Sequence, residues 1–160
     1  MPKTVPFFIL LCIILSCNPD TVFSSYTPLP GTWEKDEKIR FDFQIKDTVS
    51  RYHIFLAVRN DENYKFSNLF LITTMNLPNG TVITDTLEYA MARPDGSWLG
   101  EGFTSVKESK LWYKENMAFP APGAYHLAVE HAMREQGSIT GITRLAGITD
   151  IGIKIEKSDE

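Results

Sequence analysis

The clearest signal in the chain is an alternation of hydrophobic and polar positions with a period of two. Apolar side chains occupy every second position in residues 39–45, 124–134 and 151–156. In the second of these segments His131 falls on the apolar face and His126 on the polar face. This period predicts β-strands with one buried face and one solvated face.

Two further segments, residues 52–58 and 68–75, are apolar at nearly every position. Continuous apolar runs of this length predict strands that are covered on both faces. Asn79-Gly80 follows the second run, and Asn-Gly between two strand-like segments favours a type I′ hairpin turn, which needs positive φ twice. We therefore expect residues 82–91 to form the returning strand.

The rest of the chain also consists of strand-like segments separated by turns. We expect strands at residues 98–103 and 111–119, with a helical turn or a loop over residues 105–110 and a Gly-rich stretch over residues 137–147. Turn signals every ~8–12 residues and about eight or nine strands predict an all-β fold. We expect an antiparallel β-sandwich over residues 32–160, with either a jelly-roll or an immunoglobulin-like topology.

The first residues predict a targeting segment. Lys3 precedes an uncharged run of eleven residues, 5–15, which at about 1.5 Å per residue is too short to span a bilayer and is typical of a signal peptide. Ile14-Leu15-Ser16-Cys17 resembles the lipobox of bacterial lipoproteins. We expect a signal peptide over residues 1–16, a lipid on Cys17, and a Pro-rich tether over residues 17–31 that lifts the domain off the bilayer. A plain secreted protein is the alternative.

Charge and cysteine content narrow the classes of partner. The chain carries 16 Lys and Arg against 20 Asp and Glu, a net charge of −4 at pH 7, without a basic cluster. Such a chain is a poor candidate for binding nucleic acid or for attraction to anionic membranes. Cys12 would leave with the signal peptide and Cys17 would become a thioether, so no disulfide is expected in the mature chain.

The sequence contains no motif that indicates catalysis, a metal or a cofactor. His126 and His131 lie five residues apart on one expected strand and therefore face opposite sides, and His53 lies in another strand. Gly-x-Ser-x-Gly, His-Glu-x-x-His and Cys-x-x-Cys are all missing from the sequence. We expect a protein that is not an enzyme and takes neither a cofactor nor a small-molecule substrate.

Aromatic residues in or beside expected loops are the candidates for binding a partner. Trp98, Trp112 and Tyr113 are the strongest of them, because neighbouring side chains on a strand point to opposite faces and at least one of the last two should be exposed. Packing of the same rings in the core is the alternative interpretation.

Longer blocks of the sequence carry a family resemblance. They are residues 60–71 (NDENYKFSNLFL), 85–89 (DTLEY), 98–100 (WLG), 107–116 (KESKLWYKEN), 131–134 (HAMR) and 147–152 (GITDIG). With Asn79-Gly80 and the lipobox Cys17, these blocks resemble the GldH family of gliding-motility lipoproteins of the Bacteroidetes.

The resemblance implies a non-catalytic outer-membrane lipoprotein that is required for gliding and linked to the type IX secretion apparatus. It implies that Cys17 carries lipid, including a fatty acid such as palmitate, and that the partners are other proteins of the gliding or secretion machinery. Asn18-Pro19-Asp20 lacks the acidic cluster of a surface-export signal, which favours the periplasm-facing leaflet. A glycan-binding β-sandwich of the cell envelope is the alternative function.

Overall fold

The computed structural model describes residues 20–159, which contain ten β-strands and no helix. The strands are β1 (Thr21–Pro28), β2 (Thr32–Glu34), β3 (Ile39–Ile45), β4 (Arg51–Asn60), β5 (Asn68–Asn76), β6 (Val82–Ala90), β7 (Lys107–Ala118), β8 (Gly123–His131), β9 (Arg144–Ala146) and β10 (Ile148–Lys157). The expected signal peptide over residues 1–16 and the lipid site Cys17 lie outside the described residues.

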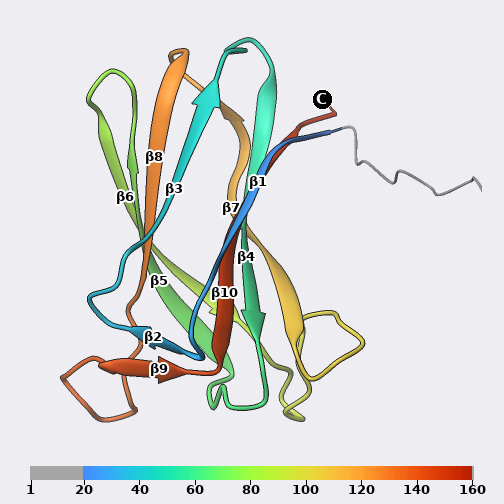
Figure 1. Cartoon of the computed structure of the whole chain (residues 1–160), viewed down its shortest axis with the longest axis vertical. Coiled ribbons are helices and arrows are strands. Elements are labelled where there is room, and N and C mark those ends of the chain that lie inside the picture. Colours follow the sequence, from blue (N-terminus) through green and yellow to red (C-terminus); the bar gives the residue numbers. More distant parts are fainter. Residues whose placement is uncertain (1–19, 160) are drawn as a thin grey trace, which may run out of the picture.

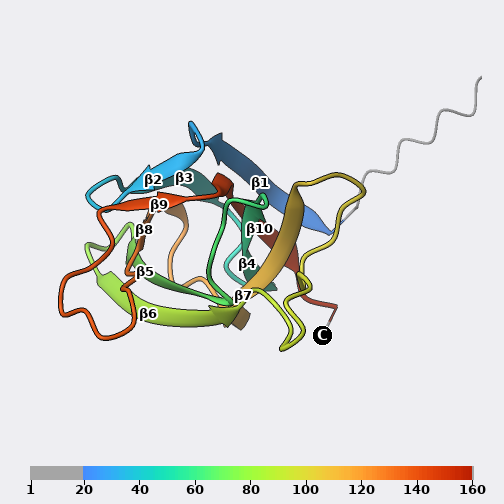
Figure 2. The same cartoon turned by 90° about the horizontal axis from the view of Figure 1, so that it is seen from below.

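Two four-stranded antiparallel sheets face each other (Figures 1 and 2). The first sheet has the order β1-β10-β4-β7 and the second has the order β3-β8-β5-β6. A short ribbon of β2 and β9 lies at one end of the sandwich (Figure 1). The predicted all-β antiparallel sandwich is therefore confirmed.

Strand pairing follows a nested pattern that selects between the two expected topologies. The hairpin of β5 and β6 is innermost, and β4 pairs with β7, β3 with β8, β2 with β9 and β1 with β10 around it. The chain is thus one long double ribbon that is folded over itself, which is the jelly-roll arrangement. Pattern along the sequence did not distinguish this topology, because it depends on which distant strands pair.

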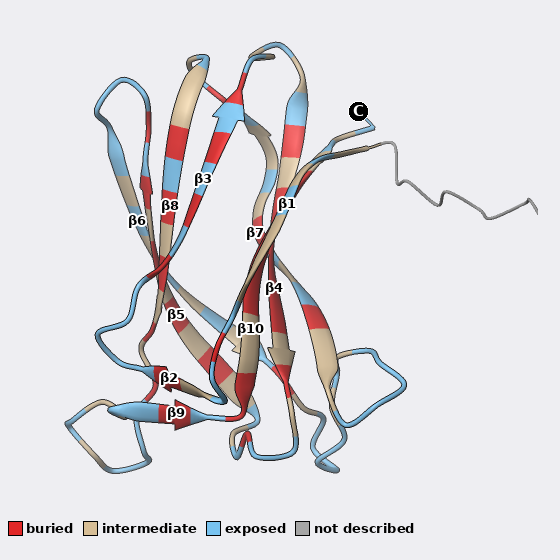
Figure 3. Cartoon of the chain, viewed as in Figure 1, coloured by how far each residue is buried: buried red, intermediate tan, exposed pale blue. Residues whose placement is uncertain are grey.

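The core lies between the sheets and follows the predicted alternation (Figure 3). In β3 the apolar residues at odd positions are buried and the polar residues between them are exposed, as predicted. Phe43 stacks on Tyr125 at a centroid distance of 5.6 Å, and Phe119 meets Tyr125 edge-on at 4.9 Å. Large rings from both sheets therefore fill the space between the layers, where their burial contributes most of the stability.

The two continuous apolar runs behave differently. Residues 54–58 of β4 are all buried, as predicted for a strand that is covered on both faces. In β5 only alternate residues are buried, and Phe70 and Ile72 on the outward face are half-buried. The prediction of full coverage is thus wrong for β5. No strand layer of residues 20–159 covers the outward face of either sheet, and in β4 the side chains of Trp112 and Lys110 cover Phe55 instead.

The first strand corrects the predicted tether of residues 17–31. Residues 21–28 form β1, which pairs with β10 from Thr21 opposite Glu156 to Pro28 opposite Asp150. The tether prediction is wrong there because Ser24 and Ser25 obscure the alternation, whereas β10 supplies the backbone partners that only the folded chain brings near.

The segment between β6 and β7 is less regular than predicted. Residues 98–103 form no strand, and only isolated bridges join Ala92 to Trp98 and Glu101 to Glu108. β7 begins at Lys107, inside the segment that we expected to be a helical turn or a loop. Residues 20–159 contain no apolar helix of membrane-spanning length.

Two glycines with positive φ provide a test of this packing. A Cβ on Gly147 (φ +87°) would lie 2.0 Å from the backbone nitrogen of Tyr64, whereas a Cβ on Gly137 (φ +81°) would meet no atom within 4 Å. We expect Gly137→Ala to cost about 1 kcal/mol from backbone strain alone. Gly147→Ala should cost about 3 kcal/mol or more because overpacking is added. Urea unfolding followed by tryptophan fluorescence measures both, and equal losses would contradict the close approach at Gly147.

Candidate functional site

The three histidines are placed separately, and none belongs to a metal-binding group. Among residues 20–159, no three His, Cys, Asp or Glu side chains converge to hold a metal ion. His126 lies on the outer face of β8, with Nδ1 2.6 Å from Asp42 Oδ1, and His131 is buried on the inner face. The predicted opposite orientation of the two is confirmed. His53 Nδ1 accepts a hydrogen bond of 3.1 Å from the Asn116 backbone N–H.

His131 has a structural environment. Its ring meets Trp33 edge-on at 5.3 Å, and Nε2 donates to the Trp33 carbonyl oxygen at 3.2 Å. Burial lowers the pKa of His131, so the neutral form is favoured. This histidine therefore holds the β2 segment against β8.

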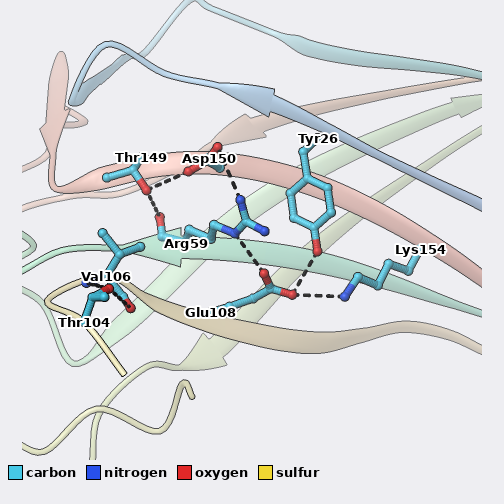
Figure 4. Close-up of polar contacts among 8 residues, drawn as sticks. All are labelled: Tyr26, Arg59, Thr104, Val106, Glu108, Thr149, Asp150 and Lys154. Carbon is cyan, nitrogen blue, oxygen red and sulfur yellow. Dashed lines mark hydrogen bonds and ion pairs between the residues drawn. The ribbon is translucent and has the colours of Figure 1, made fainter. Parts of the chain in front are cut away.

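The most connected polar group in the described residues is a cluster on the outer face of the first sheet, shown in Figure 4. We call it the Glu108 cluster; its members are Tyr26, Arg59, Glu108, Asp150 and Lys154. Glu108 Oε1 accepts a hydrogen bond of 2.8 Å from the Tyr26 hydroxyl and pairs with Lys154 Nζ at 3.0 Å. Glu108 Oε2 pairs with Arg59 Nε at 2.8 Å. One carboxylate on β7 thus binds side chains from β1, β4 and β10.

Tyr26 reaches Glu108 because small residues lie beneath its ring. In the strand register Tyr26 lies opposite Gly152, and Gly152 lies opposite Ala57. A Cβ on Gly152 would lie 2.6 Å from Tyr26 Cδ1. The Arg59 guanidinium carbon is 4.4 Å from the ring centroid, a cation–π contact. The ring is therefore fixed by contacts with both the backbone of β10 and the guanidinium.

The pKa values in the Glu108 cluster indicate a fixed network of charges. Burial alone would raise the pKa of Glu108, but hydrogen bonds from Arg59, Lys154 and Tyr26 outweigh it and lower that pKa. Burial raises the pKa of the Tyr26 hydroxyl above its ordinary value of 10.0. Glu108 is thus ionised and Tyr26 is protonated at neutral pH, so neither is set near neutrality as a general acid or base. The cluster joins four strands.

A second group of side chains lies on the same outer face and is aromatic. Phe55 is buried although it points away from the core, because Trp112 packs on it at a centroid distance of 4.4 Å and Lys110 Nζ lies 4.0 Å from its ring centroid. His53 meets Trp112 edge-on at 5.0 Å. Trp112 itself is 53% exposed. It is therefore an outward-facing ring with a rigid support.

The structure does not bring the three predicted partner-binding residues together. Tyr113 is only 8% exposed and faces the core, where its hydroxyl hydrogen-bonds Asp85 Oδ2 at 3.2 Å. Trp98 is partly buried and packs on Tyr64 at a centroid distance of 6.1 Å. Because side chains alternate along β7, Tyr113 must face inward when Trp112 faces outward. Of the three, Trp112 offers the most exposed ring.

Phe103 is an exposed residue that belongs to the aromatic residues in or beside expected loops but is not one of the three candidates named from the sequence. Its ring is fully exposed in the loop before β7, and Leu99 nearby is 43% exposed. Both line a shallow hollow that also includes Leu111 and Lys154. The expected strand over residues 98–103 concealed this feature, since a strand would have turned alternate side chains inward.

Stability as a function of pH tests the Glu108 cluster. Because the folded-state pKa of Glu108 lies below its unfolded value, its contribution is present above the unfolded pKa and is lost as pH falls through the folded pKa. Glu108→Gln places an amide N–H₂ against cationic donors and should cost about 2 kcal/mol at pH 7. Urea unfolding of both proteins from pH 7 to pH 3 should show the difference shrinking with acidity. A difference that does not change with pH would contradict the ionised role of Glu108.

Two of the solved structures that resemble this chain show distant similarity. A chain in the structure of the infectious bursal disease virus Gx strain matches 84% of this chain and 32% of its own, with a TM-score of 0.41 and 13% identity. Dimeric latent PorU from Porphyromonas gingivalis matches 86% of this chain and 13% of its own, with a TM-score of 0.36 and 9% identity. Neither similarity bears on function.

Comparison of sequences is decisive for the family. The family model described as GldH lipoprotein matches residues 21–155. The gliding motility lipoprotein GldH homolog of Christiangramia forsetii is 47% identical over 96% of this chain and 95% of its own. The gliding motility lipoprotein GldH of Flavobacterium johnsoniae is 43% identical over 98% of both chains. The chain therefore belongs to the GldH family of gliding-motility lipoproteins, as its sequence blocks indicated.

Proposed function

We propose that this protein is a non-catalytic component of the gliding machinery, anchored to the outer membrane through lipid on Cys17 and linked to the type IX secretion apparatus. The observation that carries the proposal is the 43–47% identity over nearly the full chain with proteins named for gliding motility. The lipid confines the domain to the plane of the membrane, which raises its effective concentration for partners in the same membrane. Two or three acyl chains suffice for stable anchoring.

The structure supports a role in assembly through its rigidity. The Glu108 cluster ties β1, β4, β7 and β10 together on one outer face. Beside it, Trp112 is exposed but cannot easily reorient, because Phe55 and His53 hold its ring. Exposed aromatic rings of fixed orientation are typical anchors of protein interfaces, since little side-chain entropy is lost on binding. We propose that Trp112 contacts a protein of the machinery.

The missing acidic cluster after Cys17 supports the periplasm-facing leaflet of the outer membrane as the location. In that position the domain is accessible to periplasmic parts of the secretion apparatus. Loss of surface adhesins in a deletion strain, with adhesin retained inside the cell, would support the link to secretion. Normal adhesin export in that strain would contradict the link.

The anchor is tested by complementation of a deletion strain. We expect the deletion to abolish colony spreading and single-cell gliding, and the wild-type gene to restore both. Cys17→Ala removes the thiol that would carry the lipid, so this variant should not restore movement. The variant protein should also no longer be found in the membrane fraction. Normal gliding in the deletion strain would contradict the motility role in this organism.

The partner surface is tested by comparing outward and inward aromatic residues. Trp112→Ala should abolish spreading while the protein remains folded and membrane-bound, because its ring projects outward. Tyr113→Ala should instead lower the free energy of unfolding by about 3 kcal/mol, as expected for a large side chain removed from a core. Trp98→Ala should lower the free energy of unfolding by less, because the Trp98 ring is only partly buried. If Trp112→Ala changes only stability, Trp112 is a packing residue and the surface lies elsewhere.

The glycan-binding alternative makes a different prediction for the same residue. Envelope polysaccharide should then quench the fluorescence of the wild-type protein and leave Trp112→Ala unaffected. Absence of binding to any glycan on an array would count against glycan binding.

A further inference from the structure

The sandwich has two ends, and the described chain begins and finishes at the same one (Figure 1). We call it the proximal end; it consists of the loops at residues 46–50, 77–81 and 119–122. Thr21 pairs with Glu156 beside it, and Lys157 Nζ contacts Asp47 Oδ2 in the first of these loops at 3.1 Å. The loops at residues 61–67, 92–106 and 132–143 form the opposite, distal end.

The strand β1 leaves very little chain between the expected lipid and the domain. Three residues, Asn18-Pro19-Asp20, separate Cys17 from Thr21, and even fully extended they let the two Cα atoms lie no more than about 14 Å apart. β4 has ten residues and spans the sandwich, which is therefore about 33 Å long. A lipid on Cys17 therefore keeps the start of β1, at the proximal end, close to the headgroups.

The chemistry of the proximal end suits that position. The loops at residues 77–81 and 119–122 carry no charged side chain. In the remaining loop, at residues 46–50, Val49 is 91% exposed. It lies between the exposed residues Lys46 and Arg51. A small apolar tip flanked by cations fits the boundary between headgroups and acyl chains, where the cations reach phosphate oxygens.

The one carboxylate in these three loops, that of Asp47, has both oxygens occupied by partners within the protein. Asp47 Oδ2 accepts a hydrogen bond of 2.6 Å from the Ser50 hydroxyl and contacts Lys157, and Oδ1 accepts bonds from the backbone N–H groups of Val49 and Ser50. Its partners hold the loop in a fixed shape. Four further carboxylates line a hollow beside the start of β1: Asp20, Glu115, Glu156 and Asp159. They favour a zwitterionic over an anionic lipid surface.

The distal end differs in its polar content. Charged side chains are frequent there, at residues 35–38, 61–65, 93–95 and 134–135. Its exposed apolar residues are Leu99, Phe103 and Ile139. What separates the two ends is therefore the position of the short linker after Cys17, which lies at the proximal end, and not the presence of exposed apolar side chains alone.

We infer that the domain rests directly on a zwitterionic lipid surface by its proximal end, with Val49 at headgroup depth and the distal end facing away from the membrane. The inference rests on the proposed lipid anchor at Cys17. It means that β1 fixes both the height and the orientation of the domain, so that Phe103 is presented about 30 Å from the bilayer, roughly one strand length.

Site-specific labelling in proteoliposomes tests this orientation. The mature chain has no cysteine apart from the lipid-bearing Cys17, so Val49→Cys and Ile139→Cys each introduce a single free thiol. Val49 and Ile139 are matched, since both are aliphatic and 91% and 93% exposed, at opposite ends. Each lipidated protein is labelled with an environment-sensitive dye and reconstituted in phosphatidylcholine vesicles that contain nitroxide-labelled lipid.

We expect several-fold stronger quenching by nitroxide lipid at position 49 than at position 139. Insertion of ten Gly and Ser residues after Asn18 should abolish that difference while the domain stays folded by urea unfolding. Equal quenching at both positions without the insertion, or stronger quenching at position 139, would overturn the inference. If the thiol at position 49 is shielded from labelling in cells but not in proteoliposomes, the proximal end contacts a protein partner and not lipid. That result would also overturn the inference.

Flotation of the same vesicles separates this inference from the anchor on which it depends. Protein that fails to float contradicts lipidation at Cys17, and the orientation falls with it. Protein that floats but shows no preference for position 49 leaves the anchor intact and contradicts the orientation alone.

Discussion

Pairing of β1 with β10 is the constraint on which the rest of the structure depends. It joins residues 21–28 to residues 150–156 and closes the outermost layer of the nested ribbon. It also places Tyr26 over Gly152, so the hydroxyl can reach Glu108 on β7 across the two intervening strands β10 and β4. The same pairing shortens the linker after Cys17 to three residues. Fold closure, the polar cluster and the distance to the membrane thus have one origin.

The opposite margin of the sandwich is closed by side chains, since β6 and β7 are edge strands of different sheets. Lys114 Nζ contacts Asp85 Oδ2 at 2.9 Å, and the Tyr89 hydroxyl donates to the Trp112 carbonyl oxygen at 2.7 Å. The contact with the Trp112 carbonyl oxygen occupies a backbone acceptor of the edge strand β7, which makes pairing of β7 with another chain less favourable. It also stiffens the strand that carries both Glu108 and Trp112, which suits a surface for assembly.

These features give a consistent physical picture of a gliding-motility lipoprotein. Rigidity comes from a core of large rings and from ion pairs that join strands on the outer face. In the function that we propose, orientation comes from the short linker after Cys17, and recognition comes from exposed aromatic side chains such as Trp112.

What local pattern determines was predictable from the sequence. Alternation placed the buried face of β3, β8 and β10 correctly, and blocks of residues identified the family. Asn79-Gly80 marked the position of the turn between β5 and β6, but the predicted type I′ geometry is wrong, because Gly80 has a positive φ and Asn79 does not. The opposite directions of His126 and His131, and of Trp112 and Tyr113, follow from the same period of two. These properties depend on residues close together in the chain.

Properties that depend on distant residues required the tertiary structure. β1 was hidden in an expected tether because its partner strand lies more than a hundred residues away. The jelly-roll order, the Glu108 cluster and the exposure of Phe103 likewise depend on which strands meet and which loops remain uncovered. A sequence specifies the faces of its strands through local alternation, but the neighbours of those faces are selected by packing of the whole chain.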